Sequence, residues 1–369
     1  MTPASGPPSR AAALIGKWRS VLPGRREEAP EPAASVCQPP AEPGWWSDSW
    51  VPDAYLPGFE CLTFHMPGCP HLPEEGPGHL TATLVRRGPA RRPHAVLYIH
   101  GWNEYFFQDH LAAAWERLGY DFYAIDLHRY GRSLHGEELP GYIASVTDYD
   151  GELDAAVDLI AQDHPHIVLN GHSTGGLTAA LWAAGRPGRL VGLALNSPWL
   201  DLQGSLTTRT LVPPLAKGLS TTAPTMELPR VENDIYIRSL HRAFSGEWSF
   251  DLALKRPAST PLRPGWLGAI VRAQDRVARG LAIDVPILAV LSARSTVPKQ
   301  RDEPDVSRTD TVLDVDRVAA RLPKLGWHVT LVRLDGALHD VCLSAAPVRD
   351  RYFDELRRWD LAYVKGAAS

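Results

Sequence analysis

Apolar and polar positions alternate along the chain with two different periods. Short apolar runs rich in β-branched and aromatic residues predict buried strands, because they are too short for helices and are bounded by turn-forming residues. Between them, apolar residues recur every three or four positions, which predicts amphipathic helices. The strands expected in the first half are 95–99, 121–126, 167–169 and 190–195, and the helices are 107–118, 147–162 and 177–184. This alternation predicts right-handed crossovers and a mostly parallel sheet with helices on both faces, an α/β fold.

The alternation stops near residue 200 and resumes at residue 286. Residues 201–282 contain many Pro, Thr and Arg residues and scattered aromatic residues, with no run that predicts a sheet strand. An insertion of this length at the edge where strands end predicts a largely helical lid. The remaining expected strands are 59–64, 80–85, 286–291 and 328–332, and the remaining helices are 312–322 and 349–363.

These patterns divide the chain into four parts. Residues 1–50 are rich in Pro, Ala, Glu and Ser and contain few aliphatic residues, so they cannot bury enough apolar surface to offset the entropy of ordering. We therefore expect a flexible tail there. Residues 51–200 and 283–369 are expected to form the two parts of one α/β core, and residues 201–282 the lid between them.

Composition and charge exclude some classes of function. The formal net charge of the 369 residues is -4, and the short basic clusters lack interleaved aromatic residues, so nothing favours a nucleic-acid partner. No uncharged apolar run approaches the roughly 18 residues that a membrane helix needs. We therefore expect a cytoplasmic protein without a transmembrane segment, and a peripheral membrane contact is left open.

The four cysteines, Cys37, Cys61, Cys69 and Cys342, show neither C-x-x-C spacing nor the histidine pairing of a zinc site. No structural metal is expected. A bridge between Cys61 and Cys69 across a hairpin is one interpretation, but free buried thiols in a reducing compartment are favoured over it.

The candidate chemistry is concentrated in Gly171-His172-Ser173-Thr174-Gly175, a G-x-S-x-G motif between a predicted strand and a predicted helix. A serine on such a turn is held in a strained backbone conformation with its hydroxyl standing free above the sheet. The flanking glycines are needed because side chains there would collide with neighbouring backbone. Ser173 is therefore the candidate nucleophile.

This motif is one of four local patterns that follow one another along the chain in the order found in a known family. They are His100-Gly101 with Glu104, Asp126 followed by Tyr130-Gly131-Arg132-Ser133, Gly171-His172-Ser173-Thr174-Gly175-Gly176, and Leu334-Asp335-Gly336-Ala337-Leu338-His339. Over residues 80–345 the chain thus resembles the α/β-hydrolases, and specifically their monoglyceride lipase, lysophospholipase and serine aminopeptidase branch. The resemblance implies the α/β-hydrolase fold with an inserted lid, Ser173 as nucleophile and His339 as base.

The chemistry of His339 agrees with this role, because an imidazole in a loop after the last strand can reach Ser173 and exchange a proton with it near neutral pH. Five aspartates, Asp302, Asp305, Asp310, Asp314 and Asp316, follow the strand at 286–291, where a carboxylate is needed to orient the histidine. We choose Asp310, since the run Asp310-Thr311-Val312-Leu313-Asp314 resembles that of the family. The loop before it is longer than usual, so Asp305 and Asp314 stay as rivals, and Asp310 would serve equally well as a helix N-cap.

An acyl-transfer intermediate needs two preorganised donors for its oxyanion. The backbone N–H of Thr174, at the start of the serine helix, is one by geometry, and the resemblance implies the N–H of Trp102 as the other. Trp102 departs from the small residue common in the family. Its indole narrows the acyl pocket or packs on the lid, and packing is favoured.

The expected activity is that of a serine hydrolase that needs no cofactor and cleaves a carboxylic ester through an acyl-enzyme. The resemblance and the lid favour a lipid-like substrate such as a monoacylglycerol or a lysophospholipid. A thioesterase or peptidase of the same fold stays open. So does a non-catalytic binding protein, since Arg129 stands where the family often has glycine and fold alone does not fix function.

Overall fold

The structure is a computed structural model, and it describes residues 49–204, 206–229, 234–297 and 304–366. The tail predicted for residues 1–50 falls almost wholly outside these residues, as do Cys37 and Asp302. None of the helices in the described ranges is both long and apolar enough to cross a bilayer.

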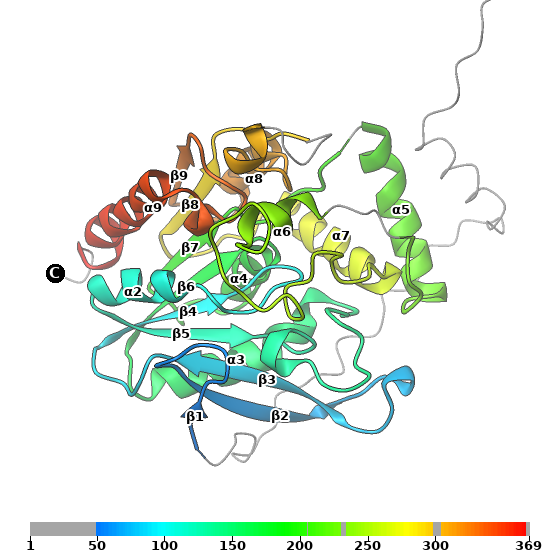
Figure 1. Cartoon of the computed structure of the whole chain (residues 1–369), viewed down its shortest axis with the longest axis horizontal. Helices are drawn as coiled ribbons and strands as arrows, with labels where there is room; N and C mark the ends of the chain where they lie inside the picture. The colour runs from blue at the N-terminus through cyan, green and yellow to red at the C-terminus, as the bar shows by residue number, and fades with distance from the viewer. Residues whose placement is uncertain (1–48, 205, 230–233, 298–303, 367–369) are drawn as a thin grey trace, which may run out of the picture. The chain divides into compact units, whose positions relative to one another are not determined.

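A twisted sheet forms the centre of the described chain (Figure 1). Its nine strands are β1 (Val51–Pro52), β2 (Glu60–Pro70), β3 (His79–Arg86), β4 (His94–Ile99), β5 (Tyr120–Asp126), β6 (His166–His172), β7 (Gly192–Asn196), β8 (Ile287–Ser292) and β9 (Val329–Leu334). They lie in the order β1-β2-β3-β5-β4-β6-β7-β8-β9. The pairs from β1 to β5 are antiparallel, and all pairs from β5 to β9 are parallel. The predicted α/β fold with a mostly parallel sheet is confirmed.

Helices cover both faces of this sheet, because its strands are apolar on both. In β4, Val96 and Tyr98 pack with α2 (Asp109–Arg117) and α9 (Ala346–Trp359). Leu97 and Ile99 of the same strand pack with α3 (Asp150–Ala161), α4 (Thr174–Gly185) and α8 (Val315–Arg321). Each fully buried aliphatic side chain contributes roughly 1.5–3 kcal/mol, so the two-sided core holds the strand ends in fixed positions.

The segment between β7 and β8 contains α5 (Leu206–Thr222), α6 (Ile235–Leu240) and α7 (Pro264–Arg279). We call residues 201–282 the insertion. Helix α7 begins with Pro264 in its first turn, where no N–H is needed, and ends at Gly280, whose φ of 103° suits glycine. One side of α7, including Trp266 and Ile270, joins the core cluster of α3 and α4. The insertion is therefore packed onto the core through α7.

The prediction about the thiols is wrong for Cys69, which is disulfide-bonded. Cys61 and Cys342 are free thiols, as expected. A bridge from Cys61 to Cys69 is ruled out because both lie on β2, which extends well beyond the predicted end at residue 64. Cys61 is a free thiol, and cysteines eight positions apart on one extended strand lie well beyond the Cα separation of about 7 Å that a disulfide allows.

Candidate active site

Ser173 lies on a sharp turn between β6 and α4. Its φ of 53° and ψ of -116° are a conformation that residues with a side chain rarely adopt. Two glycines permit the turn: a Cβ on Gly171 would lie 2.6 Å from the carbonyl oxygen of Gly175, and one on Gly175 would lie 2.3 Å from that of His100. A larger residue at Gly171 would push α4 away from β6, and one at Gly175 would push α4 away from the end of β4, so the motif is required by packing.

Ser173, His339 and Asp310 form a hydrogen-bonded chain. The Oγ atom of Ser173 is 3.0 Å from Nε2 of His339, and Nδ1 of His339 is 2.9 Å from Oδ2 of Asp310. A carboxylate only accepts, so Nδ1 carries the proton and Nε2 is free to accept from the serine hydroxyl. The three residues are 7%, 3% and 0% exposed, respectively. The arrangement can therefore move a proton from Ser173 to His339 out of contact with bulk water.

The carboxylate of Asp310 is fixed from two sides. Its Oδ1 atom accepts from the backbone N–H groups of Val312 and Leu313, both at 2.8 Å, which leaves Oδ2 for His339. Asp310 does not cap a helix, because α8 begins later and Asp314 is its N-cap, accepting from the N–H of Arg317. Asp305 is exposed, in a short 3₁₀ turn. Of the three aspartates weighed from the sequence, the structure brings Asp310 to His339.

The loop after β4 lies directly against the serine turn. A Cβ on Gly101 would be 3.1 Å from the Cβ of Ser173, so the backbones approach closely. Within the described chain, the N–H of Trp102 donates to no protein group, and the N–H of Thr174 has no partner inside the helix that it begins. Both predicted oxyanion donors are thus available. The indole of Trp102 packs on the insertion, with its ring centroid 3.8 Å from that of Trp266.

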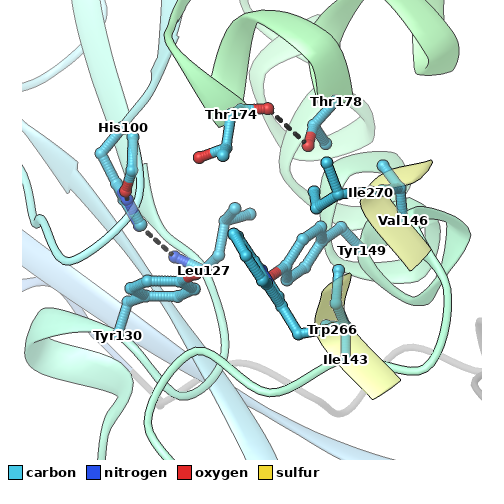
Figure 2. Close-up of a pocket in the computed structure, with 11 residues that line it drawn as sticks. His100, Leu127, Tyr130, Ile143, Val146, Tyr149, Thr174, Thr178, Trp266 and Ile270 are labelled. Carbon is cyan, nitrogen blue, oxygen red and sulfur yellow. Dashed lines mark hydrogen bonds between the residues drawn. The ribbon is translucent and has the colours of Figure 1, made fainter. Parts of the chain in front are cut away.

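A small pocket of about 10 Å³, room for about one water molecule, adjoins Thr174 and Gly101, the residue before Trp102 (Figure 2). It is lined by His100, Gly101, Leu127, Tyr130, Ile143, Val146, Tyr149, Thr174, Thr178, Trp266 and Ile270. Its polar side chains are partly satisfied within the wall: Nε2 of His100 accepts from the N–H of Leu127, and the hydroxyl of Thr178 donates to the carbonyl of Thr174. Burial raises the pKa of Tyr130 and of Tyr149, so both phenols stay neutral. The wall therefore suits an uncharged, largely apolar group.

Behind His339 lies His172, with the two ring centroids 4.9 Å apart. Its Nδ1 donates to the carbonyl of Asn196 at 3.1 Å, and burial lowers its pKa, which keeps the ring neutral near pH 7. A neutral neighbour does not oppose the positive charge that His339 would gain on taking a proton. His172 therefore packs against His339 without opposing its positive charge.

One cluster has the composition of a metal site. Ligand atoms of Glu104, His172 and Asp340 lie within 4.8 Å of one another, all buried. Protein donors already occupy the carboxylates, however. Glu104 accepts from Lys255 and from the N–H of Gly101, and Asp340 from the side chains of Gln108 and Asn196 and the N–H of Cys342. The cluster fits a cation poorly, because the ammonium of Lys255 supplies the compensating charge.

Asp340 of this cluster and Lys255 beside it were not identified from the sequence. Asp340 follows His339 directly, but nothing distinguished it from a surface aspartate. Lys255 lies in the insertion, where no periodic pattern predicts its position, and its partner Glu104 is distinguished in the sequence only as part of a motif. Their burial, at 0% and 2% exposure, comes from contacts between segments far apart in sequence.

Comparison with known proteins adds an independent line of evidence. The family model described as serine aminopeptidase, S33, matches residues 91–343. Phospholipase YtpA of Bacillus subtilis is 34% identical over 142 residues, which cover 38% of this chain and 53% of that protein. Monoglyceride lipase of Rattus norvegicus is 30% identical over 155 residues, 41% of this chain and 50% of that protein. The chain thus spans about half the length of the curated relatives it matches.

Solved structures share the fold at lower identity. A monoacylglycerol lipase of Paleococcus ferrophilus superimposes with a TM-score of 0.54 at 19% identity, covering 72% of this chain and 92% of that one. A soluble variant of monoglyceride lipase from Saccharomyces cerevisiae gives a TM-score of 0.54 at 17% identity, covering 79% and 95%. At these identities the likeness concerns the arrangement of strands and helices.

Proposed function

Because the chain belongs to the serine aminopeptidase S33 family and has the α/β-hydrolase fold, we propose that it is a serine hydrolase that cleaves a lipid-like carboxylic ester through an acyl-enzyme. The observation that carries this proposal is the buried hydrogen-bonded chain from Ser173 through His339 to Asp310. A scaffold used only for binding has no need of a strained serine aligned with a histidine and a fixed carboxylate.

In the proposed reaction, Oγ of Ser173 attacks the ester carbonyl carbon while Nε2 of His339 takes the hydroxyl proton. Asp310 holds the ring in the correct tautomer and stabilises its positive charge. The negative charge on the carbonyl oxygen is stabilised by the N–H groups of Trp102 and Thr174. His339 then gives its proton to the leaving alcohol, and the acyl group stays on Ser173. Water, activated by His339, hydrolyses this acyl-enzyme to the carboxylic acid and restores the serine.

The small pocket lies beside the loop and the turn that carry the two donors, and we propose that the acyl group binds against it. It has an uncharged, largely apolar wall and adjoins Gly101 and Thr174, which flank Ser173. Relatives named as a monoglyceride lipase and a phospholipase favour a monoacylglycerol or a lysophospholipid. Rates on short esters, long esters, thioesters and aminoacyl amides would separate an esterase from a thioesterase or a peptidase, since these share the mechanism and differ in the pocket.

The test is intact mass after incubation with a fluorophosphonate, which phosphonylates an activated serine. We expect one adduct on the wild type, none on Ser173→Ala and greatly slowed labelling of His339→Ala. Ser197→Ala is the matched control, because Ser197 is also buried, follows the neighbouring strand β7 and has a positive φ of 45°. Labelling that persists in Ser173→Ala would refute the proposal. A folded wild type that takes up no probe would favour a non-catalytic binding protein.

A further inference from the structure

The insertion is bonded to the loop that carries the proposed oxyanion donor. The side chain of Asn103, whose φ is 55°, donates from Nδ2 to the carbonyl of Arg256 at 2.9 Å. Its Oδ1 atom accepts from the N–H of Arg256 at 3.3 Å and from the hydroxyl of Thr260 at 3.1 Å. The next residue, Glu104, accepts from Nζ of Lys255 at 2.5 Å. Two consecutive loop residues after Trp102 are thus held by one short segment of the insertion.

The carboxylate of Glu104 connects Lys255 to the oxyanion loop. Its Oε1 atom binds the ammonium of Lys255, and its Oε2 atom accepts from the N–H of Gly101 at 3.0 Å. Gly101 directly precedes Trp102, so this bond helps to set the direction of the peptide that carries the Trp102 N–H. A hydrogen-bond donor for an oxyanion is effective only when its direction is fixed before the reaction.

Water cannot take the place of Lys255. The side chains of Lys255 and Glu104 are 3% and 1% exposed. The ammonium also faces the rings of Phe107, Tyr236 and Phe250, whose centroids lie 5.7, 5.8 and 5.9 Å away. Without its cation, the carboxylate of Glu104 would be buried beside Asp340 with no compensating charge. It would have to take up a proton or turn away, and either change weakens its bond to Gly101.

We propose that Lys255 is a positioning residue of the oxyanion hole, which it orders by holding Glu104 against the N–H of Gly101. The inference rests on the proposed function and deepens it. The insertion then forms part of the site that stabilises the transition state, in addition to any role in admitting substrate.

The experiment compares Lys255→Met, Glu104→Gln and the variant with both changes. In Glu104→Gln a single amide oxygen must serve two donors, Lys255 and Gly101, so one bond is lost. In the double variant the competing ammonium is gone, and the oxygen is free for the N–H of Gly101. The double variant should therefore react faster than either single variant, which additive damage to the fold cannot produce. Lys217→Met is the matched control: Lys217 is also in the insertion and paired with Asp275, but both side chains are nearly half exposed.

The readout is fluorophosphonate labelling followed over probe concentration, which separates the maximal rate from the probe's affinity. Removing one oxyanion donor typically slows an enzyme by about 100-fold to 1,000-fold, and misdirecting one should cost less. We expect Lys255→Met to lower the maximal rate by about 10-fold to 100-fold with affinity within about threefold, since only transition-state stabilisation changes. Lys217→Met should match the wild type.

Two results would overturn the inference while leaving the proposed function intact: a labelled wild type with Lys255→Met equally fast, or a double variant no faster than the single variants. Should Lys255→Met fail to fold, the comparison of the double variant with Glu104→Gln decides. An unlabelled wild type would overturn the proposed function itself, and this inference with it.

Discussion

Replacing Asp310 with asparagine tests the proposed chemistry with the smallest change in shape. The two backbone N–H groups of Val312 and Leu313 point at Oδ1 of Asp310, so in Asp310→Asn that position must hold the amide oxygen. The amide NH₂ then faces Nδ1 of His339, where the carboxylate Oδ2 was. A ring nitrogen that faces a donor must be unprotonated, so Nε2 carries the proton and cannot accept one from Ser173.

The expected loss of kcat follows from the free energy needed to restore the active tautomer of His339. To restore the active tautomer, the amide must turn over, which leaves its NH₂ opposite two buried backbone donors. Each lost hydrogen bond to a buried donor costs about 1–3 kcal/mol, so the active form lies about 2–6 kcal/mol higher. At 1.36 kcal/mol per tenfold, kcat should fall by about 30-fold to 26,000-fold. The upper part of this range matches the roughly 10,000-fold loss known for the same exchange in serine proteases.

The assay is kcat on a soluble p-nitrophenyl ester, with thermal unfolding to verify the fold. Asp314→Asn is the control, because Asp314 caps α8 and asparagine caps a helix as well as aspartate does. It should leave both rate and stability near wild-type values. If Asp310→Asn keeps kcat within tenfold of the wild type while unfolding normally, the tautomer argument fails. A large loss in Asp314→Asn at unchanged stability would move the acid to that residue.

Three further predictions concern the pocket, the turn and the pH dependence of stability. Trp266→Leu should shift the preferred p-nitrophenyl ester towards longer acyl chains, because Trp266 lines the pocket; an equal loss of kcat/KM at every chain length would contradict this. Gly175→Ala should lower the melting temperature sharply, since its Cβ would lie 2.3 Å from a backbone oxygen. The control is Gly185→Ala, in open space at the end of the same helix, which should be neutral or stabilising by up to about 1 kcal/mol. Equal melting temperatures of the two variants would refute the packing argument. Burial holds the pKa of His172 below its ordinary 6.5 in the folded state. The unfolded chain therefore binds that proton more readily, and the free energy of unfolding should decrease as the pH falls through 6.5. His172→Asn should flatten this dependence in urea titrations, and an unchanged slope would show that other groups cause it.

Much of the core could be predicted from the sequence because its signals are local. The apolar run before Ser173 and the helix formers after it identify a strand, a turn and a helix without knowledge of anything else. The observed strand, β6, ends at His172, directly before the serine. Parallel strands buried on both faces are the elements that the sequence predicts most clearly. Continuous apolar runs separated by amphipathic helices are typical of the α/β class and of few other folds.

The features that were missed depend on contacts between distant segments. The sequence did not show that Cys61 and Cys69 lie on one strand. Strand β2 continues through a bulge, and the polar and proline residues there do not follow a strand pattern. The choice among the aspartates after β8 came from a resemblance, and only the contact of Asp310 with His339 and the start of α8 after Asp314 distinguish Asp310 from a helix cap. Nothing in the sequence around Lys255 indicates that it is buried, because its burial depends on the contact with Glu104, which is distant in sequence.

The topology of the sheet explains how an insertion without sheet strands can act on the oxyanion loop. That loop follows β4, Ser173 follows β6, and Asp310 and His339 lie in the segments after β8 and β9. Carboxyl ends of parallel strands meet at one edge of a sheet, so these groups converge there. The insertion follows β7, which lies between the strand before Ser173 and the strand before Asp310, and it therefore leaves the core at the centre of the candidate site. From that position Lys255 reaches Glu104 beyond β6, and substitutions in the insertion should alter the rate of the chemical step as well as access of the substrate.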